Sequence, residues 1–260
     1  MPYIHFTSIG PEIPNAKPQP IFRVDRKYPA SFFHLILSKE DNNPKENDVE
    51  NNLKEIIKTL ETTGIGYQVH YLRVEEFWQN VATLAEMIAR INSEYDIILN
   101  FSAGRRVFIS TMVLAGSLIK GWQPEKNILC VQTSDAYEVT FEPNLPMIPD
   151  NDDRVILSKI NNFEEELKSN SNAKLTTDDI GDVLKKGQST ISTRIKKLIQ
   201  ADYMEIKGHT KNLQPKGKAI VNVMNNLAND GIDPFNQEKI MKKRETNKQH
   251  WKRRKNKKQE

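Results

Sequence analysis

Two adjacent arginines follow a turn of small residues that joins an apolar strand to an apolar helix. The strand is expected over Asp96–Asn100, the turn reads Asn100-Phe-Ser-Ala-Gly-Arg-Arg106, and the helix runs on to Ile119. Small residues let a ligand approach the backbone, a helix N-terminus offers free N–H groups, and arginines add fixed positive charge. The pattern predicts a site for an anionic ligand and favours a phosphodiester. The candidate ligand-binding residues of the turn are Asn100, Ser102, Ala103, Gly104, Arg105 and Arg106.

The same turn also fits a purely structural interpretation, in which Ser102 and Gly104 only form a tight turn and begin the helix. It matches neither G-x-x-x-x-G-K-[ST] nor G-x-G-x-x-G, so we expect neither a P-loop site nor a standard dinucleotide site. The five histidines lack ligand spacing and Cys130 is the only cysteine, so we expect no metal site and no required cofactor. No apolar run has the length of a membrane span and no signal-type start is present, which predicts a cytoplasmic protein without membrane contact.

Apolar runs that fit buried strands alternate with stretches that have the apolar repeat of a helix. Strands are expected at 4–9, 32–37, 67–73, 96–100 and 127–132, with a short edge strand at 138–141, and helices across 53–60, 77–91 and 105–119. The proline-rich stretch from Gly10 to Pro29 is expected to be an irregular loop without a helix. The alternation predicts an α/β, Rossmann-like fold with a mainly parallel sheet. Ligands bind beyond the carboxyl ends of such strands, so Thr7 and Ser8 should line the same site as the turn.

The composition changes after Pro143–Asp153, which we interpret as a linker. We therefore expect a first domain at 1–150, a second at 151–232 and a basic, disordered tail at 233–260. In the second domain, helical patterns around Gly187 are followed by two short strands that flank a basic loop. This order predicts a small α+β winged helix-turn-helix domain.

The helix after Gly187 carries short polar side chains first and cations after them on its outward face. That arrangement suits a recognition helix in the major groove of double-stranded DNA, where polar groups meet base edges and cations meet phosphates. A small helical domain for protein contacts is the alternative. The candidate DNA-binding residues are Gln188, Ser189, Thr190, Ser192, Thr193, Arg194, Lys196 and Lys197 on the helix, with Lys207, His209 and Lys211 in the wing.

The net charge of +4 is unevenly distributed along the 260 residues. From Lys239 to Glu260 there are eleven Lys or Arg residues and two Glu residues. The tail is therefore strongly basic, and the rest of the chain is mildly acidic. Such a segment is either an arm that attracts nucleic-acid phosphates or a solubilising tail.

The order of these parts resembles the archaeal CRISPR-associated transcription regulators that join a CARF sensor domain to a winged helix-turn-helix. In that family the fourth strand ends in a turn of the type Asn-x-[ST]-Gly-Gly-[ST]-[KR], and Asn100–Arg106 stands in its place. Ala103 replaces the first glycine and Arg105 replaces the Ser or Thr, while Arg106 holds the basic position. The resemblance covers roughly residues 1–230 as an architecture.

The resemblance implies a homodimer whose CARF-like domains form one pocket for a cyclic oligoadenylate, typically the tetra-adenylate. Ser102, Gly104, Arg105 and Arg106 would hold phosphates or ribose, and Thr7 and Ser8 would line the floor. It also implies a ligand-responsive regulator of CRISPR-associated promoters in antiviral defence. Two alternatives stay open: a ring nuclease that slowly cleaves its cyclic ligand, although the turn offers no general base, and a winged-helix regulator that senses another nucleotide outside CRISPR.

Overall fold

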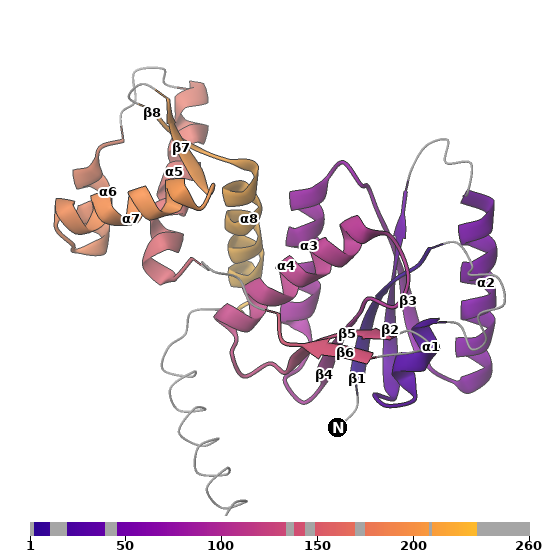
Figure 1. Cartoon of the computed structure of the whole chain (residues 1–260). Coiled ribbons are helices and arrows are strands. Elements are labelled where there is room, and N and C mark those ends of the chain that lie inside the picture. The colour runs from indigo at the N-terminus through magenta and orange to yellow at the C-terminus, as the bar shows by residue number, and fades with distance from the viewer. Residues whose placement is uncertain are drawn as a thin grey trace, which may run out of the picture. The chain divides into compact units, whose positions relative to one another are not determined.

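The computed structural model describes residues 3–10, 20–39, 46–133, 138–143, 149–169, 175–207 and 210–232. These residues fall into two compact units, one on each side of the step from Leu145 to Pro146 (Figure 1). Each unit has its own secondary structure and its own buried apolar residues. The predicted basic tail and His209 lie outside the described residues.

The first unit is built on a six-stranded sheet in the order β3-β2-β1-β4-β5-β6. The five parallel strands are β1 (Tyr3–Ser8), β2 (Ala30–Ser38), β3 (Gly66–Leu72), β4 (Asp96–Asn100) and β5 (Ile128–Thr133). The last strand, β6 (Glu138–Phe141), pairs antiparallel with β5 at the edge. The predicted mainly parallel, Rossmann-like α/β fold is confirmed, and β4 has the bounds expected from the sequence.

Helices cover both faces of this sheet (Figure 1). The helices α1 (Pro20–Asp25) and α2 (Glu46–Thr63) lie on one face, where Ile21 and Ile56 share a core with Leu35 of β2. On the other face α3 (Phe77–Arg90) packs against α4 (Arg106–Trp122). Gly116 of α4 lies against Leu99 of β4, because a Cβ at position 116 would be 2.7 Å from the Leu99 side chain. The apolar repeats of the sequence thus become the inner faces of a three-layer structure.

The expectation that residues 10–29 contain no helix is wrong. The helix α1 begins at Pro20, and proline is well suited to the first helical position because its missing N–H has no partner there in any helix. Ile21 and Val24 are almost completely buried, so tertiary packing stabilises this short helix. Its last turn is closed by the carbonyl of Val24, which accepts hydrogen bonds from the N–H groups of Lys27 and Tyr28.

The second unit contains four helices and one antiparallel hairpin among the residues that the structure describes. In chain order these are α5 (Asn151–Ser169), α6 (Thr177–Leu184), α7 (Gln188–Gln200), β7 (Met204–Lys207), β8 (Thr210–Leu213) and α8 (Pro215–Asn229). Thr176 caps α6 through a capping box with Asp179. Gly187 is the N-cap of α7 and completes the turn between α6 and α7.

The start of α5 corrects a second expectation. Residues 151–153 belong to its first turn and not to a linker. The physical reason is a reciprocal cap: the N–H of Asp153 donates to the Asp150 carboxylate, and the N–H of Asp150 donates to the Asp153 carboxylate. Carboxylates at the beginning of a helix also interact favourably with its dipole.

Two histidines of the first unit, the buried His5 and the half-buried His34, have pKa values below the usual range. The Nε2 of His5 lies 2.7 Å from the carbonyl oxygen of Tyr28, and the Nδ1 of His34 lies 3.0 Å from the Nε2 of His70. Burial lowers the pKa of His5 and of His34 to about 4 in each case, although the bond to Tyr28 partly opposes this for His5. Both rings are therefore neutral in the folded protein at pH 7.

We expect the first unit to lose stability as the pH falls from about 6.5 toward 4. In that interval the unfolded chain binds protons at these positions and the folded chain does not, so the free energy of unfolding rises with pH. At pH 5 the loss should be on the order of 1–2 kcal/mol per histidine relative to pH 7. Urea unfolding at pH 7, 6 and 5 measures this loss. The free energy of unfolding of the His5→Gln variant should depend less steeply on pH. Equal slopes of unfolding free energy against pH for the two proteins would show that His5 does not cause the loss.

Candidate functional site

The candidate ligand site lies where the sheet reverses its direction of growth. From β1 the chain moves outward to β2 and β3, and from β4 it moves the other way to β5. β1 and β4 are hydrogen-bonded neighbours, with Thr7 opposite Asn100 at their carboxyl ends. In open α/β sheets the crevice beyond such a reversal is the usual ligand position. The structure thus brings Thr7 and Ser8 together with the turn after β4, as the sequence predicts.

The turn lies directly on the end of β1. Gly104 has φ = +91°, and a Cβ there would be 2.1 Å from the Oγ of Ser8 and 2.6 Å from its carbonyl carbon. The N–H of Arg105 donates to the same Oγ at 3.3 Å. Gly10 contacts the turn from the other side, since a Cβ at Gly10 would be 3.1 Å from the Cα of Gly104. Only glycine allows this backbone conformation and this approach without strain.

Two side chains hold the turn from within. Asn100 is completely buried, and its Oδ1 accepts a hydrogen bond from the N–H of Ser102 at 3.0 Å while its Nδ2 donates to the carbonyl of Ile21 at 3.2 Å. The Oγ of Ser102 lies 2.9 Å from the Oγ1 of Thr133 and accepts from the Thr133 N–H at 3.0 Å. Asn100 and Ser102 therefore shape the turn, and the Ser102 hydroxyl is already engaged.

Sequence reasoning did not identify Thr133 or Asn52. Thr133 ends β5, next to β4, so a polar residue at the end of the neighbouring strand was the available signal. Asn52 lies inside α2, where its Nδ2 donates to the carbonyl of Gly10 at 2.8 Å and supports the residue that contacts Gly104. No local pattern marks that contact, because it joins positions 42 residues apart.

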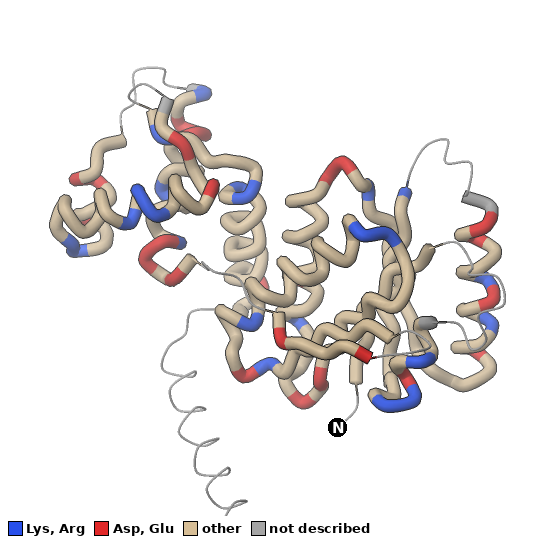
Figure 2. Tube along the Cα trace, viewed as in Figure 1, with Lys and Arg blue, Asp and Glu red and all other residues tan. Residues whose placement is uncertain are grey.

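Accessibility separates the predicted site residues into two groups. Thr7, Ser8 and Asn100 are completely buried and form the support of the site. Ser102, Ala103, Gly104 and Arg105 are half-buried, and Arg106 is exposed. Arg105 is the N-cap of α4 and makes no side-chain cap, and the first turn of α4 contains no acidic residue. The start of α4 therefore combines two arginines with the positive end of the helix dipole, and Figure 2 shows this basic segment.

The second candidate site is the outward face of α7. Gln188, Ser189, Thr190, Ser192, Thr193, Lys196 and Lys197 are all exposed. Two of them have partners within the unit, because Gln188 donates to Asp178 and the Oγ1 of Thr193 donates to the carbonyl of Ser189. Lys211 of β8 donates to the carbonyl of Leu175 at 2.8 Å. Lys207 belongs to β7, but its side chain, like His209, is not among the described parts.

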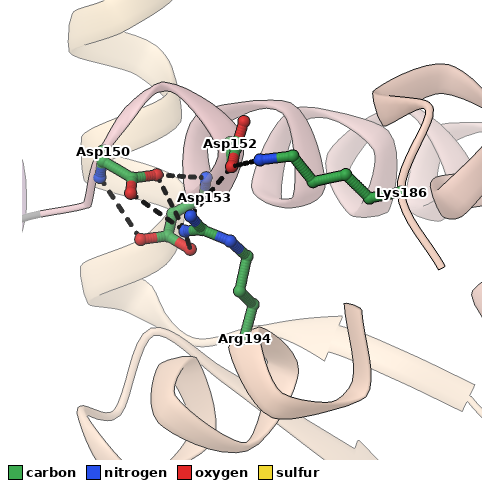
Figure 3. Close-up of polar contacts among 5 residues, drawn as sticks. All are labelled: Asp150, Asp152, Asp153, Lys186 and Arg194. Carbon is green, nitrogen blue, oxygen red and sulfur yellow. Dashed lines mark hydrogen bonds and ion pairs between the residues drawn. The ribbon is translucent and has the colours of Figure 1, made fainter. Parts of the chain in front are cut away.

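Arg194 differs from the other predicted residues of α7. Its side chain is only 23% exposed, and it forms ion pairs with Asp150, Asp152 and Asp153 (Figure 3). The structure therefore separates Arg194 from Lys196 and Lys197, which the sequence had grouped with it.

Within the described ranges, His, Cys, Asp and Glu side chains nowhere gather in threes that could hold a metal ion. Among the helices that the structure describes, none combines the length and apolar character needed to cross a membrane.

No protein-family model matches this chain, and no curated protein matches its sequence. Among solved structures, the chain is similar to Enterococcus italicus Csm6 bound to cyclic hexa-2'-fluoro-hexa-dAMP, with a TM-score of 0.38 and 12% identity over 76% of this chain and 55% of that one. It is also similar to protein VC1899 from Vibrio cholerae, with a TM-score of 0.36 and 9% identity over 85% of this chain and 66% of that one. The chain thus spans little more than half of the first protein.

We expect Gly104→Ala to destabilise the protein more than Gly64→Ala does. Both glycines have positive φ, +91° and +72°, so both substitutions carry a backbone strain of roughly 1–2 kcal/mol. Only position 104 also meets another group, since Ser8 occupies the place of the new methyl, whereas a Cβ at Gly64 has nothing within 4 Å. Overpacking adds about 1–3 kcal/mol.

Urea unfolding of the two variants measures this difference directly. Gly64→Ala is the matched control for the strain of positive φ. Equal losses in the two variants would mean that the turn is not held against the end of β1.

Proposed function

We propose that this chain is a dimeric, ligand-responsive DNA-binding regulator whose first unit binds a cyclic oligoadenylate at the turn after β4. The observation that carries the proposal is the packing of Gly104 on Ser8 at the reversal of the sheet, which sets Arg105 and Arg106 at the beginning of α4. Backbone N–H groups, a helix N-terminus and two guanidinium groups together suit a phosphodiester.

The choice of a cyclic oligoadenylate rests on the resemblance of Asn100–Arg106 to the CARF-type turn. The half-buried positions 103 and 105, where this chain departs from that pattern, adjoin the backbone that would meet the ligand. In this proposal the tetra-adenylate is the effector, and CRISPR-associated promoters are the targets.

A homodimer completes the proposed site. Ile109 and Val113, four residues apart on one face of α4, are only half-buried within one chain. A second copy packed on this face would cover them and would bring two turns to one two-fold axis, which suits a cyclic ligand.

The second unit supplies the proposed DNA-binding part, a winged helix-turn-helix with α7 as recognition helix. Exposed hydroxyl side chains at the beginning of α7 are suited to base edges, and Lys196 and Lys197 near its end are suited to phosphates. Paired recognition helices in a dimer would read two half-sites, and ligand binding in the first unit would change affinity for them.

We expect isothermal titration with cyclic tetra-adenylate to show one ligand per dimer. The Arg105→Ala, Arg106→Ala double variant should lose this binding, because charge-assisted hydrogen bonds to the phosphates are removed. Lys58→Ala with Arg90→Ala is the charge-matched control, since these residues lie on α2 and at the end of α3. The ligand should be recovered intact by chromatography, because the turn contains no histidine or carboxylate as general base. Absence of both heat and a thermal shift with the unaltered protein would refute the proposed ligand.

We expect the protein to select specific duplexes from a random-sequence library. With a selected duplex, Lys196→Ala and Lys197→Ala should each make the dependence of log affinity on log salt concentration shallower by about 0.9, because each removes one phosphate contact. Lys54→Ala on α2, in the first unit, is the control. Fluorescence anisotropy across a KCl series measures the slopes, and unchanged slopes would exclude α7 as the contact surface.

A further inference from the structure

Arg194 turns away from the outward face of α7 and enters a group of three carboxylates at the beginning of α5 (Figure 3). We call Asp150, Asp152 and Asp153 the aspartate cluster. The Nη1 of Arg194 lies 2.9 Å from both carboxylate oxygens of Asp150 and 2.8 Å from Oδ1 of Asp153. Its Nη2 lies 2.8 Å from Oδ2 of Asp152. Both terminal nitrogens of the guanidinium are thus bound within the unit.

The aspartate cluster is held in place by the helix that carries it. The Asp153 N–H donates to Oδ1 of Asp150 at 3.0 Å, and the Asp150 N–H donates to Oδ2 of Asp153 at 3.3 Å. Lys186, just before α7, forms a further ion pair with Asp152. The carboxylates are therefore ordered by capping of α5 and by a second cation, and Arg194 meets a preformed acceptor set.

Burial and charge keep Arg194 in this position. The Asp153 side chain is only 8% exposed, and burial raises its pKa above the usual range even though Arg194 acts in the opposite direction. Withdrawal of the guanidinium would leave a buried carboxylate without its principal partner, which is strongly unfavourable. A DNA phosphate at this place would also meet Asp150, whose side chain is 57% exposed, and like charges repel.

We propose that Arg194 is a positioning residue that fixes α7 on the first turn of α5 and does not itself bind DNA. The inference rests on the proposed DNA-binding function of α7. The buried residues Ile191 and Leu198 hold one face of α7 by apolar packing, which tolerates small rotations of the helix. The hydrogen bonds of a guanidinium shared among three carboxylates have fixed directions, so this contact does not tolerate such rotations. The fork of Arg194 thereby sets the direction in which the exposed Ser192, Thr193 and Lys197 point.

The test uses Arg194→Lys, which keeps the charge and the ability to bind phosphate but loses the planar fork. A selected duplex is titrated across a KCl series with the full-length protein. We expect affinity to fall about tenfold, the loss of roughly one base contact, with an unchanged salt slope. The matched second variant is Asp153→Asn, which keeps the side-chain shape. Its DNA affinity across the same salt series tests the proposal if Arg194→Lys does not fold. Asp182→Asn on α6 removes an equal charge without touching the cluster and is its control.

The outcomes separate this inference from the proposed function. If Arg194 binds phosphate, Arg194→Lys keeps its affinity, and Asp153→Asn binds more tightly than Asp182→Asn because the guanidinium is released. Either result overturns the positioning role while DNA binding stands. If Asp153→Asn binds more weakly than Asp182→Asn with parallel salt dependence, the positioning role is supported. A protein that selects no duplex at all would refute the proposed function and, with it, this inference.

Discussion

The close approach of Gly104 to Ser8 is the constraint on which the candidate site depends. It is possible only because position 104 has no side chain and adopts a positive φ, and it occurs at the one place where the strand order reverses. Buried polar groups then secure it: Asn100 shapes the turn from below, Asn52 supports Gly10, and Thr133 engages Ser102. These buried contacts position the exposed residues of the turn.

Arginines in the two units illustrate how burial decides what a charge does. Arg106 is exposed at a helix N-terminus, where nothing acidic in the first turn neutralises it. Arg194 is mostly buried and is surrounded by carboxylates that a helix cap has ordered. The charge of Arg106 therefore leaves positive potential for an external anion, whereas the charge of Arg194 is neutralised by carboxylates of the same unit.

Sequence patterns predicted the elements that are fixed by contacts between residues close in the chain. The apolar runs identified the strands, down to the bounds of β4. The start of α6 also has a local cause, because Thr176 and Asp179, three residues apart, form its capping box. The missed start of α5 has a local cause, the reciprocal cap between Asp150 and Asp153, but the other misses depend on distant partners. The helix α1 exists because Ile21 and Val24 are buried by the sheet, and Arg194 appeared to belong with Lys196 because its aspartates lie more than 40 residues earlier. Sequence spacing cannot indicate which of several cations will be covered.

The geometry of the turn also divides its positions by their freedom to vary during evolution. Position 104 is closed to any side chain, and Asn100 is committed to hydrogen bonds that no smaller residue could make. Ala103 is half-buried and packs against the apolar core of the first unit, Arg105 is the half-buried N-cap of α4, and Arg106 is exposed. The two differences from the CARF-type pattern, Ala103 and Arg105, fall outside positions 100 and 104. A lineage could therefore alter the chemistry offered to a ligand by single substitutions while the surrounding backbone stayed unchanged.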